Sequence, residues 1–134
     1  MTMTLQLAIG REEGFDAPAT TSGYPFPAQR NHNPGNIIWG TFAKLHGATG
    51  SAGKGYALFP DDQTGWNALT ALLQTPMYKG KTVEQALNEY CPPPNGHALT
   101  ENNDPDAYVK NVCSWIGCQP TTIIDGLLFA VPVT

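Results

Sequence analysis

The stretch AIGREEGF, residues 8–15, places two adjacent glutamates at the end of an expected helix and follows them with a glycine. A helix is predicted over residues 4–13, because its apolar residues recur at helical spacing: Leu5, Ala8 and Ile9. At about 100° per residue, Glu12 falls at the centre of this apolar stripe and Glu13 at its margin. Periodicity by itself therefore favours Glu12 as the buried acid, whereas fraying of the helix at Gly14 would leave both acids in solvent.

Length and composition describe one globular domain over residues 1–134. Hydrophobic residues make up 41% of the chain and charged residues 13%, which is unlike a disordered segment. The net charge of −4, with basic residues scattered singly, argues against a nucleic-acid binder. No apolar run is long enough to span a membrane, and the N-terminal residues lack the basic start of a signal peptide. The three cysteines are odd in number, which favours reduced thiols: Cys91, Cys113 and Cys118.

After the first helix, the sequence predicts a loop and then a short β region. Residues 16–29 are rich in proline, glycine, serine and threonine and are expected to form a loop. Residues 36–59 are rich in branched and aromatic side chains around a glycine-rich centre, which predicts a hairpin or small sheet. The chain then returns to helical periodicity, so the fold class predicted is α+β and mainly helical.

Four helices are expected after residue 60. The first, over residues 64–75, has Asp62 or Thr64 available as its cap and buries Trp66 with nearby leucines. The second opens at Thr82 with a capping-box spacing to Gln85. The third begins with Asp104 as cap and ends at residue 117, and the last is a short helix over residues 121–131. Its inward-facing residues are expected to be Ile123, Ile124, Leu127 and Leu128.

Several motifs resemble one family of enzymes. The stretch AIGREEG is similar to the Ala-Ile-x-x-x-Glu-Ser/Gly pattern of goose-type lysozymes and soluble lytic transglycosylases, whose catalytic acid lies five residues after the alanine. The stretch RNHNPGN, residues 30–36, resembles the Arg-Asn-Asn-Asn-Pro-Gly-Asn block of small phage and prophage lysozyme-like proteins. The later pieces keep the family's order over roughly residues 8–118: Phe59, Gly65 to Leu69, Pro92 to Pro94, Glu101 with Asn102, and Tyr108. Departures are His32 in place of asparagine, an insertion between Asn103 and Tyr108, and Gly14 in place of serine.

The resemblance implies a lysozyme-like fold, with a small sheet after the catalytic helix, and a catalytic glutamate at Glu13. Periodicity and motif thus disagree, and we favour Glu13 because a proton donor must reach substrate. Glu12 is then expected to bond backbone or Arg30. Asparagine amides suit sugar hydroxyls and N-acetyl groups, although asparagine beside Pro34 also builds turns. The expected substrate-binding residues are Arg30, Asn31, Asn33, Asn36, Tyr90 and Tyr108, the last matching the family position where an aromatic meets the glutamate.

Two mechanisms remain open at this point. An inverting muramidase needs a second carboxylate to activate water, whereas a lytic transglycosylase needs none, because the muramic 6-hydroxyl attacks. The possible second carboxylates are Asp61, Asp62 and Glu101, with Asp104 and Asp106 less suited. Asp62 and Asp104 are better explained as helix caps, and Asp61 and Asp106 as solvated acids, so no convincing second acid emerges from the sequence. The histidines and cysteines have no metal-ligand spacing, so neither a metal nor a cofactor is expected.

The expected function is cleavage of the β-1,4 bond between N-acetylmuramic acid and N-acetylglucosamine in peptidoglycan, by a phage or prophage lytic transglycosylase with one glutamate as general acid and base. An inverting muramidase that uses a second carboxylate is the alternative enzyme. A virion or tail protein that binds glycan without cutting it, and a chitin-directed hydrolase, are alternatives. The protein is expected to be made in the bacterial cytoplasm without a signal peptide and to act on glycan strands in the periplasm or cell wall. Its partners would then include virion or secretion-apparatus components.

Overall fold

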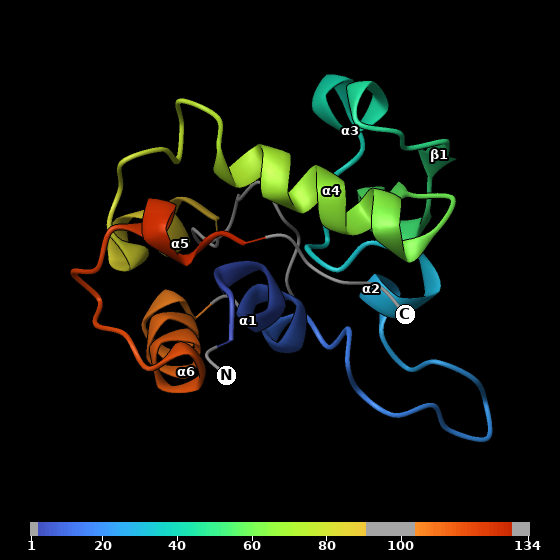
Figure 1. The fold of residues 1–134 in the computed structure, drawn as a ribbon. Coiled ribbons are helices and arrows are strands. Elements are labelled where there is room, and N and C mark those ends of the chain that lie inside the picture. Colours follow the sequence, from blue (N-terminus) through green and yellow to red (C-terminus); the bar gives the residue numbers. More distant parts are fainter. Residues whose placement is uncertain (1–2, 91–103, 130–134) are drawn as a thin grey trace.

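The computed structural model describes residues 3–90 and 104–129. Figure 1 shows helix α1 (Leu5–Glu12) in the middle of the molecule, with α4 (Asp62–Leu73) crossing above it. Helices α5 (Val83–Tyr90) and α6 (Pro105–Ile116) lie to one side. The short helices α2 (Pro27–Arg30) and α3 (Thr41–Leu45) and the small sheet lie on the other side. Helix α1 packs against both α6 and α4, and α5 packs against α6, so one core joins the helices. The prediction of a mainly helical α+β fold is confirmed.

Helix α1 spans Leu5–Glu12, and the two ends of the predicted range, Thr4 and Glu13, are its capping residues. Its first turn is capped by Thr4, whose side chain accepts a hydrogen bond from the Leu7 amide at 3.1 Å. The predicted apolar residues are buried, and so are Gln6 and Gly10. The amide of Glu13 still donates to the Ile9 carbonyl at 2.9 Å, so the helix end does not fray before Gly14.

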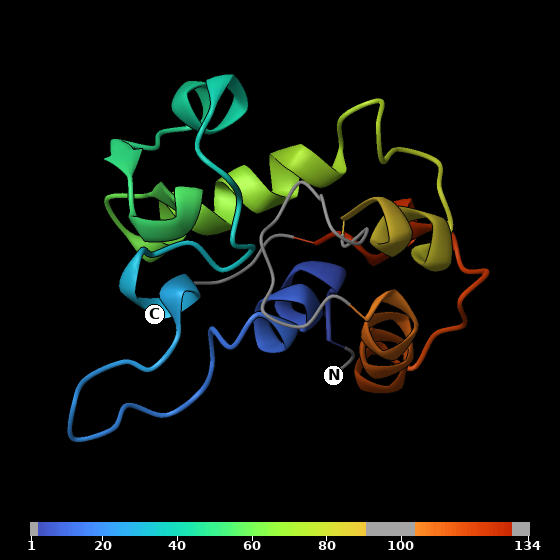
Figure 2. The same ribbon diagram turned by 180° about the vertical axis from the view of Figure 1, so that it is seen from behind.

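The loop after α1 is shorter than predicted. It extends away from the helices (Figure 2) and ends at Phe26, because the four-residue helix α2 begins there and spans Pro27–Arg30. A proline at the first position of a helix loses no hydrogen bond, since that amide has no partner within the helix. The Gln29 side chain accepts a bond from the Phe26 amide at 3.2 Å and so fixes the helix start.

The predicted hairpin or small sheet is present as two short strands. Strands β1, Gly50–Ser51, and β2, Ala57–Leu58, pair antiparallel, with the 3-10 turn η1, Gly53–Gly55, between them. Ile38 adds an isolated bridge to Tyr56. The expectation of strand through residues 36–45 was wrong beyond this bridge, because Thr41–Leu45 form helix α3. Within α3 the Phe42 ring stacks on His46 at one helical turn, with centroids 4.3 Å apart, which favours the helix.

The later helices follow the predicted signals closely, with one corrected cap. Helix α4 spans Asp62–Leu73, and its cap is Asp61, whose side chain accepts a hydrogen bond from the Thr64 amide at 2.8 Å. The expected caps, Asp62 and Thr64, both lie inside the helix. The buried face of α4 carries the predicted residues Trp66, Leu69, Leu72 and Leu73.

Helices α5 and α6 start where the sequence predicts. Helix α5 spans Val83–Tyr90, and Thr82 and Gln85 exchange the two bonds of a capping box. Helix α6 spans Pro105–Ile116 between the cap Asp104 and a left-handed Gly117.

The last element is the 3-10 helix η2, Ile124–Leu127. Ile124 is buried, but Ile123 is 47% exposed, so the prediction that Ile123 faces inward was wrong. Its backbone instead forms an isolated bridge to Thr82, which turns the side chain outward. Among the described residues, no helix is long and apolar enough to cross a membrane.

Candidate functional site

Glu13 is the buried acid at the end of α1, with 6% of its surface exposed. It lies one turn after Ile9 and two turns after Leu5, both fully buried. The periodicity argument for Glu12 failed because it counted only apolar residues. Gln6 and Gly10 are also buried, and they move the centre of the buried face toward Glu13.

Two distant segments bring hydrogen-bond donors to the two oxygens of Glu13. The Tyr108 hydroxyl, on α6, donates to Oε2 at 2.7 Å. The Asn36 side-chain amide donates to Oε1 at 2.9 Å from a loop residue with a left-handed backbone, φ 49°. Both donors are buried, and Asn36 Oδ1 is a buried acceptor without a partner among the described residues.

This environment holds a proton on Glu13. The pKa of Glu13 is raised from the ordinary value of 4.5 to about 8, chiefly by burial and to a smaller extent by the nearby charge of Glu12. The hydrogen bonds from Tyr108 and Asn36 act in the opposite direction, because they favour the ionised form. They occupy two of about four acceptor positions of the carboxyl group, which leaves room for the proton. At neutral pH the group is therefore mostly a neutral carboxylic acid.

Glu12 faces a different neighbour. Its Oε2 accepts a bond from the Asn111 side chain of α6 at 3.2 Å, and burial raises its pKa while this bond lowers it. The expected contact with Arg30 was wrong, because Arg30 Nη1 donates to the Tyr24 carbonyl at 2.9 Å instead. Glu12 is only partly buried, so it is the less perturbed acid of the pair.

The segment of residues 30–36, which we call the asparagine loop, is held by its own side chains. Asn33 is fully buried and donates to the carbonyls of Ile37 and Ala57, while its oxygen accepts from the Ile37 amide. All of these polar groups are used inside the fold, so Asn33 shapes the loop. Asn31 joins the loop to the sheet region, because its carbonyl accepts from the Phe59 amide at 3.0 Å.

Two contacts fasten this loop to helices. The Tyr90 hydroxyl, at the end of α5, donates to the Gly35 carbonyl; Tyr90 is fully buried and supports the loop from inside. Gly65 in α4 lies so close to the loop that a Cβ atom there would be 2.1 Å from the His32 carbonyl oxygen. The glycine before Trp66 in the sequence is therefore required by this close approach.

Neither of the expected second carboxylates that the structure describes, Asp61 and Asp62, bonds to Glu13. Asp61 is an exposed helix cap, and hydrogen bonds from Thr64 lower its pKa. Asp62 lies 2.7 Å from His32 Nδ1, a pair that the sequence analysis did not anticipate. Glu101 lies outside the described residues.

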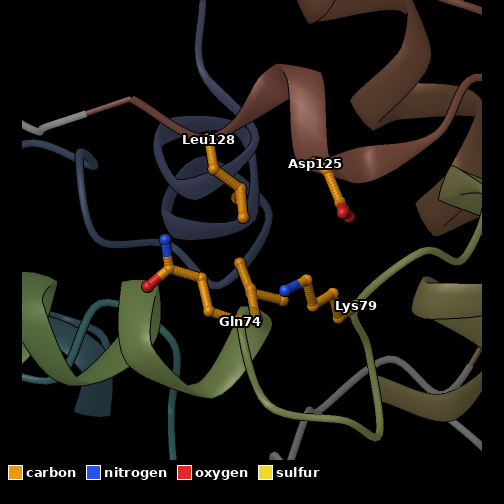
Figure 3. Close-up of a pocket in the computed structure, with 5 residues that line it drawn as sticks. Gln74, Lys79, Asp125 and Leu128 are labelled. Carbon is orange, nitrogen blue, oxygen red and sulfur yellow. The ribbon is translucent and has the colours of Figure 1, made fainter.

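The His32 and Asp62 pair lines a cavity of about 150 Å³ together with Phe15, Tyr24 and Gln29. Phe15 follows Glu13 by two residues, so this cavity begins just beyond the end of α1. A different cavity of about 170 Å³ lies between the end of α4 and η2 (Figure 3). Its lining residues are Leu73, Gln74, Lys79, Asp125 and Leu128, none of which bonds to Glu13.

In the part of the chain that the structure describes, no three histidine, cysteine or acidic side chains are grouped so that they could hold a metal ion. Cys113 and Cys118 are free thiols whose sulfur atoms lie 3.7 Å apart at the end of α6. Cys91 lies outside the described residues. No protein-family model matches the chain, and no curated protein matches it either.

Proposed function

We propose that this protein is a lysozyme-like glycosidase that cleaves the β-1,4 bond between N-acetylmuramic acid and N-acetylglucosamine, with Glu13 as the proton donor. The observation that carries the proposal is the buried carboxyl of Glu13, held between Tyr108 and Asn36 with a pKa of about 8. Cleavage of a glycosidic bond requires a proton on the leaving oxygen, and an ordinary exposed glutamate would have lost it at neutral pH.

The residues around Glu13 have distinct parts in this reaction. Glu13 gives its proton to the glycosidic oxygen and becomes a carboxylate, which the donors Tyr108 and Asn36 stabilise. That carboxylate then takes the proton of the muramic 6-hydroxyl as this oxygen attacks C1, which leaves a 1,6-anhydro end and restores the acid. The unpartnered oxygen of Asn36 is suited to accept a bond from a sugar hydroxyl or N-acetyl group.

The transglycosylase route is favoured because it needs only one carboxyl group. Hydrolysis with inversion is the second candidate, and the position of Asp62 beside His32 in the cavity next to Phe15 favours it. In that route Asp62 would activate the water molecule, which requires the two carboxyl groups to lie roughly 6.5–9.5 Å apart. A third candidate, glycan binding without cleavage by a virion component, predicts no product at all.

Mass spectrometry of the material released from purified murein separates these candidates. A lytic transglycosylase releases products with 1,6-anhydro ends, whereas a muramidase releases reducing ends that are heavier by one water molecule. We expect anhydro products from the unmodified protein, and equal activity of an Asp62→Asn variant. Reducing ends together with loss of activity in Asp62→Asn would establish the hydrolytic route instead. Absence of any release would overturn the proposed function.

We further propose that the protein is made in the bacterial cytoplasm and reaches the glycan strands of the wall with the help of virion or secretion-apparatus components. Pull-down with purified murein sacculi tests the glycan part of this proposal. The acidic chain is not expected to adhere to an anionic polymer without a specific site, so retention on sacculi would support specific recognition.

A further inference from the structure

The end of α6 brings two thiols together. Cys113 lies in the last turn of the helix, and Cys118 is the first residue beyond Gly117, whose left-handed backbone turns the chain back. The amides of Gly117 and Cys118 both donate to the Cys113 carbonyl, at 2.8 and 3.1 Å. The bond from Cys118 is typical of a Schellman motif, in which the side chains at these two positions come into contact. The sulfur atoms of Cys113 and Cys118 are accordingly 3.7 Å apart.

Bonds to a neighbouring helix hold this thiol pair in place. The segment after Cys118 runs toward η2 (Figure 1), and its carbonyls at Pro120 and Thr122 accept hydrogen bonds from two amides at the start of α5. These are the amides of Glu84 and Val83, at 3.0 and 2.8 Å. Helix α6 itself also packs against α5. Both cysteines are therefore fixed relative to the same helix, and their contact is part of the fold.

The two thiols differ in their access to solvent. Cys113 is buried, with 8% of its surface exposed, whereas Cys118 is partly exposed. The pKa of the Cys113 thiol is raised to about 12, chiefly by burial and further by the hydrogen bond with Cys118 and the charge of Cys118. Both cysteines line a cavity of about 460 Å³ between α6, the start of α5 and the segment after α6. A small reagent in this cavity therefore reacts with Cys118 first.

We propose that Cys113 and Cys118 form a redox site, which a disulfide oxidant converts into an intramolecular disulfide bond that stabilises the end of α6. A disulfide bond is about 2.05 Å long, so the two sulfur atoms must approach by roughly 1.7 Å. Rotation about the Cα–Cβ bond of Cys118 can supply this movement, because the residue lies beyond the helix. A reducing cytoplasm keeps the thiols apart, and an oxidising compartment favours the bond. The site holds whether or not Glu13 is catalytic.

The reaction is thiol–disulfide exchange in two steps. The thiolate of Cys118 attacks one sulfur of the oxidant, the S–S bond of the oxidant breaks, and one thiol leaves with the proton that Cys118 released. The thiolate of Cys113 then attacks the Cys118 sulfur of this mixed disulfide, and the second thiol leaves with the Cys113 proton. Two cysteine thiols are thus oxidised while one disulfide is reduced to two thiols. In the mixed disulfide, Cys118 carries neither a charge nor a hydrogen, which removes two of the three causes that raise the pKa of Cys113.

The test starts from reduced protein and uses oxidised glutathione as the oxidant. After incubation, the remaining thiols are blocked with iodoacetamide in urea, and the protein is digested with trypsin without reduction. Trypsin cuts after Lys110, and no lysine or arginine follows, so Cys113 and Cys118 lie together on the peptide of residues 111–134. Cys91 lies on a different peptide. The matched variants are Cys91→Ser, which leaves only the proposed pair, and Cys91→Ser with Cys118→Ser, which removes one partner.

We expect the peptide of residues 111–134 to lose two hydrogen atoms and to carry no label, both in the unmodified protein and in Cys91→Ser. Dithiothreitol should restore both labels. The oxidised form should melt roughly 5 °C higher than the reduced form, because a bond that closes a short loop restricts the unfolded chain. The variant that also carries Cys118→Ser should show neither change.

Three results would overturn the redox site: both thiols still labelled, glutathione retained on Cys118 with Cys113 labelled, or Cys91 linked to either thiol in place of the pair. An oxidised form that melts no higher than the reduced form would overturn the stabilising role of the bond.

Discussion

Replacing Glu13 by glutamine should change how the stability of the protein depends on pH. The folded state holds the proton of Glu13 more tightly than the unfolded state, because burial raises its pKa from 4.5 to about 8. The unfolded chain therefore loses this proton first as the pH rises. Stability from this group is fully present below pH 4.5, falls as the pH rises toward about 8, and levels off above that value. Glutamine does not titrate, so this loss is absent in Glu13→Gln.

The size of the effect follows from the same two pKa values. One proton bound only in the folded state gives a slope of roughly 1.4 kcal/mol per pH unit. Over the window from 4.5 to about 8 the unmodified protein should lose about 5 kcal/mol relative to Glu13→Gln, and about 3 kcal/mol of this by neutral pH. Burying the glutamine amide in place of the carboxyl group can also change the free energy of unfolding by an amount that does not depend on pH. Such a change moves the difference between the two proteins equally at every pH and leaves its pH dependence intact.

Urea unfolding at a series of pH values measures this difference, with the fluorescence of buried Trp66 as a reporter. Other titrating groups are shared by the two proteins and cancel in the comparison. The stability curves should diverge steadily as the pH rises from 4.5 and run parallel above about 8. Curves that are parallel throughout this range would refute the claim that Glu13 is buried as a neutral acid.

Three further predictions concern Tyr108, the close approach at Gly65, and the cysteines at the end of α6. Tyr108→Phe removes the 2.7 Å bond that favours the carboxylate, so the pKa of Glu13 should rise by roughly one unit, measured as a shift of the alkaline limb of the pH–activity profile. Gly65→Ala should lower the free energy of unfolding by about 1–3 kcal/mol, measured by urea unfolding, because its methyl group meets a carbonyl of the asparagine loop; an unchanged midpoint would contradict this close approach. Reducing agent should leave the melting temperature unchanged, because Cys113 and Cys118 are free thiols. Iodoacetamide followed by peptide mass mapping should label Cys118 before Cys113, because burial raises the pKa of Cys113 to about 12. Equal labelling rates for the two thiols would contradict the burial of Cys113.

Helix boundaries were predictable where a local signal sets them. The capping box of Thr82 and Gln85 and the Asp104 cap gave correct starts for α5 and α6, because these bonds join residues close in sequence. The cap of α4 was displaced by one residue, since two adjacent aspartates offer the same chemistry and only the fold pairs Asp62 with His32. Helix α3 was missed because branched and aromatic residues around it favour strand.

The candidate site was predictable only through its motif. The buried face of α1 includes Gln6, a polar residue whose side-chain amide donates to Thr70 Oγ1 and to the Phe129 carbonyl, both more than sixty residues away in the sequence. No helical periodicity contains that information. The motif spacing identified Glu13, and the family position of Tyr108 anticipated their contact. The roles of Asn33 and Tyr90 as internal supports depend on long-range bonds that residue type does not reveal.

The most direct test of the central claim compares two adjacent substitutions, Glu13→Gln and Glu12→Gln, in the rate of dye release from labelled murein. Glutamine at 13 keeps the size of the side chain but cannot deliver a proton, so activity should fall by at least about 10²-fold while circular dichroism stays unchanged. Glutamine at 12 can still accept the bond from Asn111, so most activity should remain. A dead Glu12→Gln beside an active Glu13→Gln would contradict the assignment of Glu13 as the proton donor.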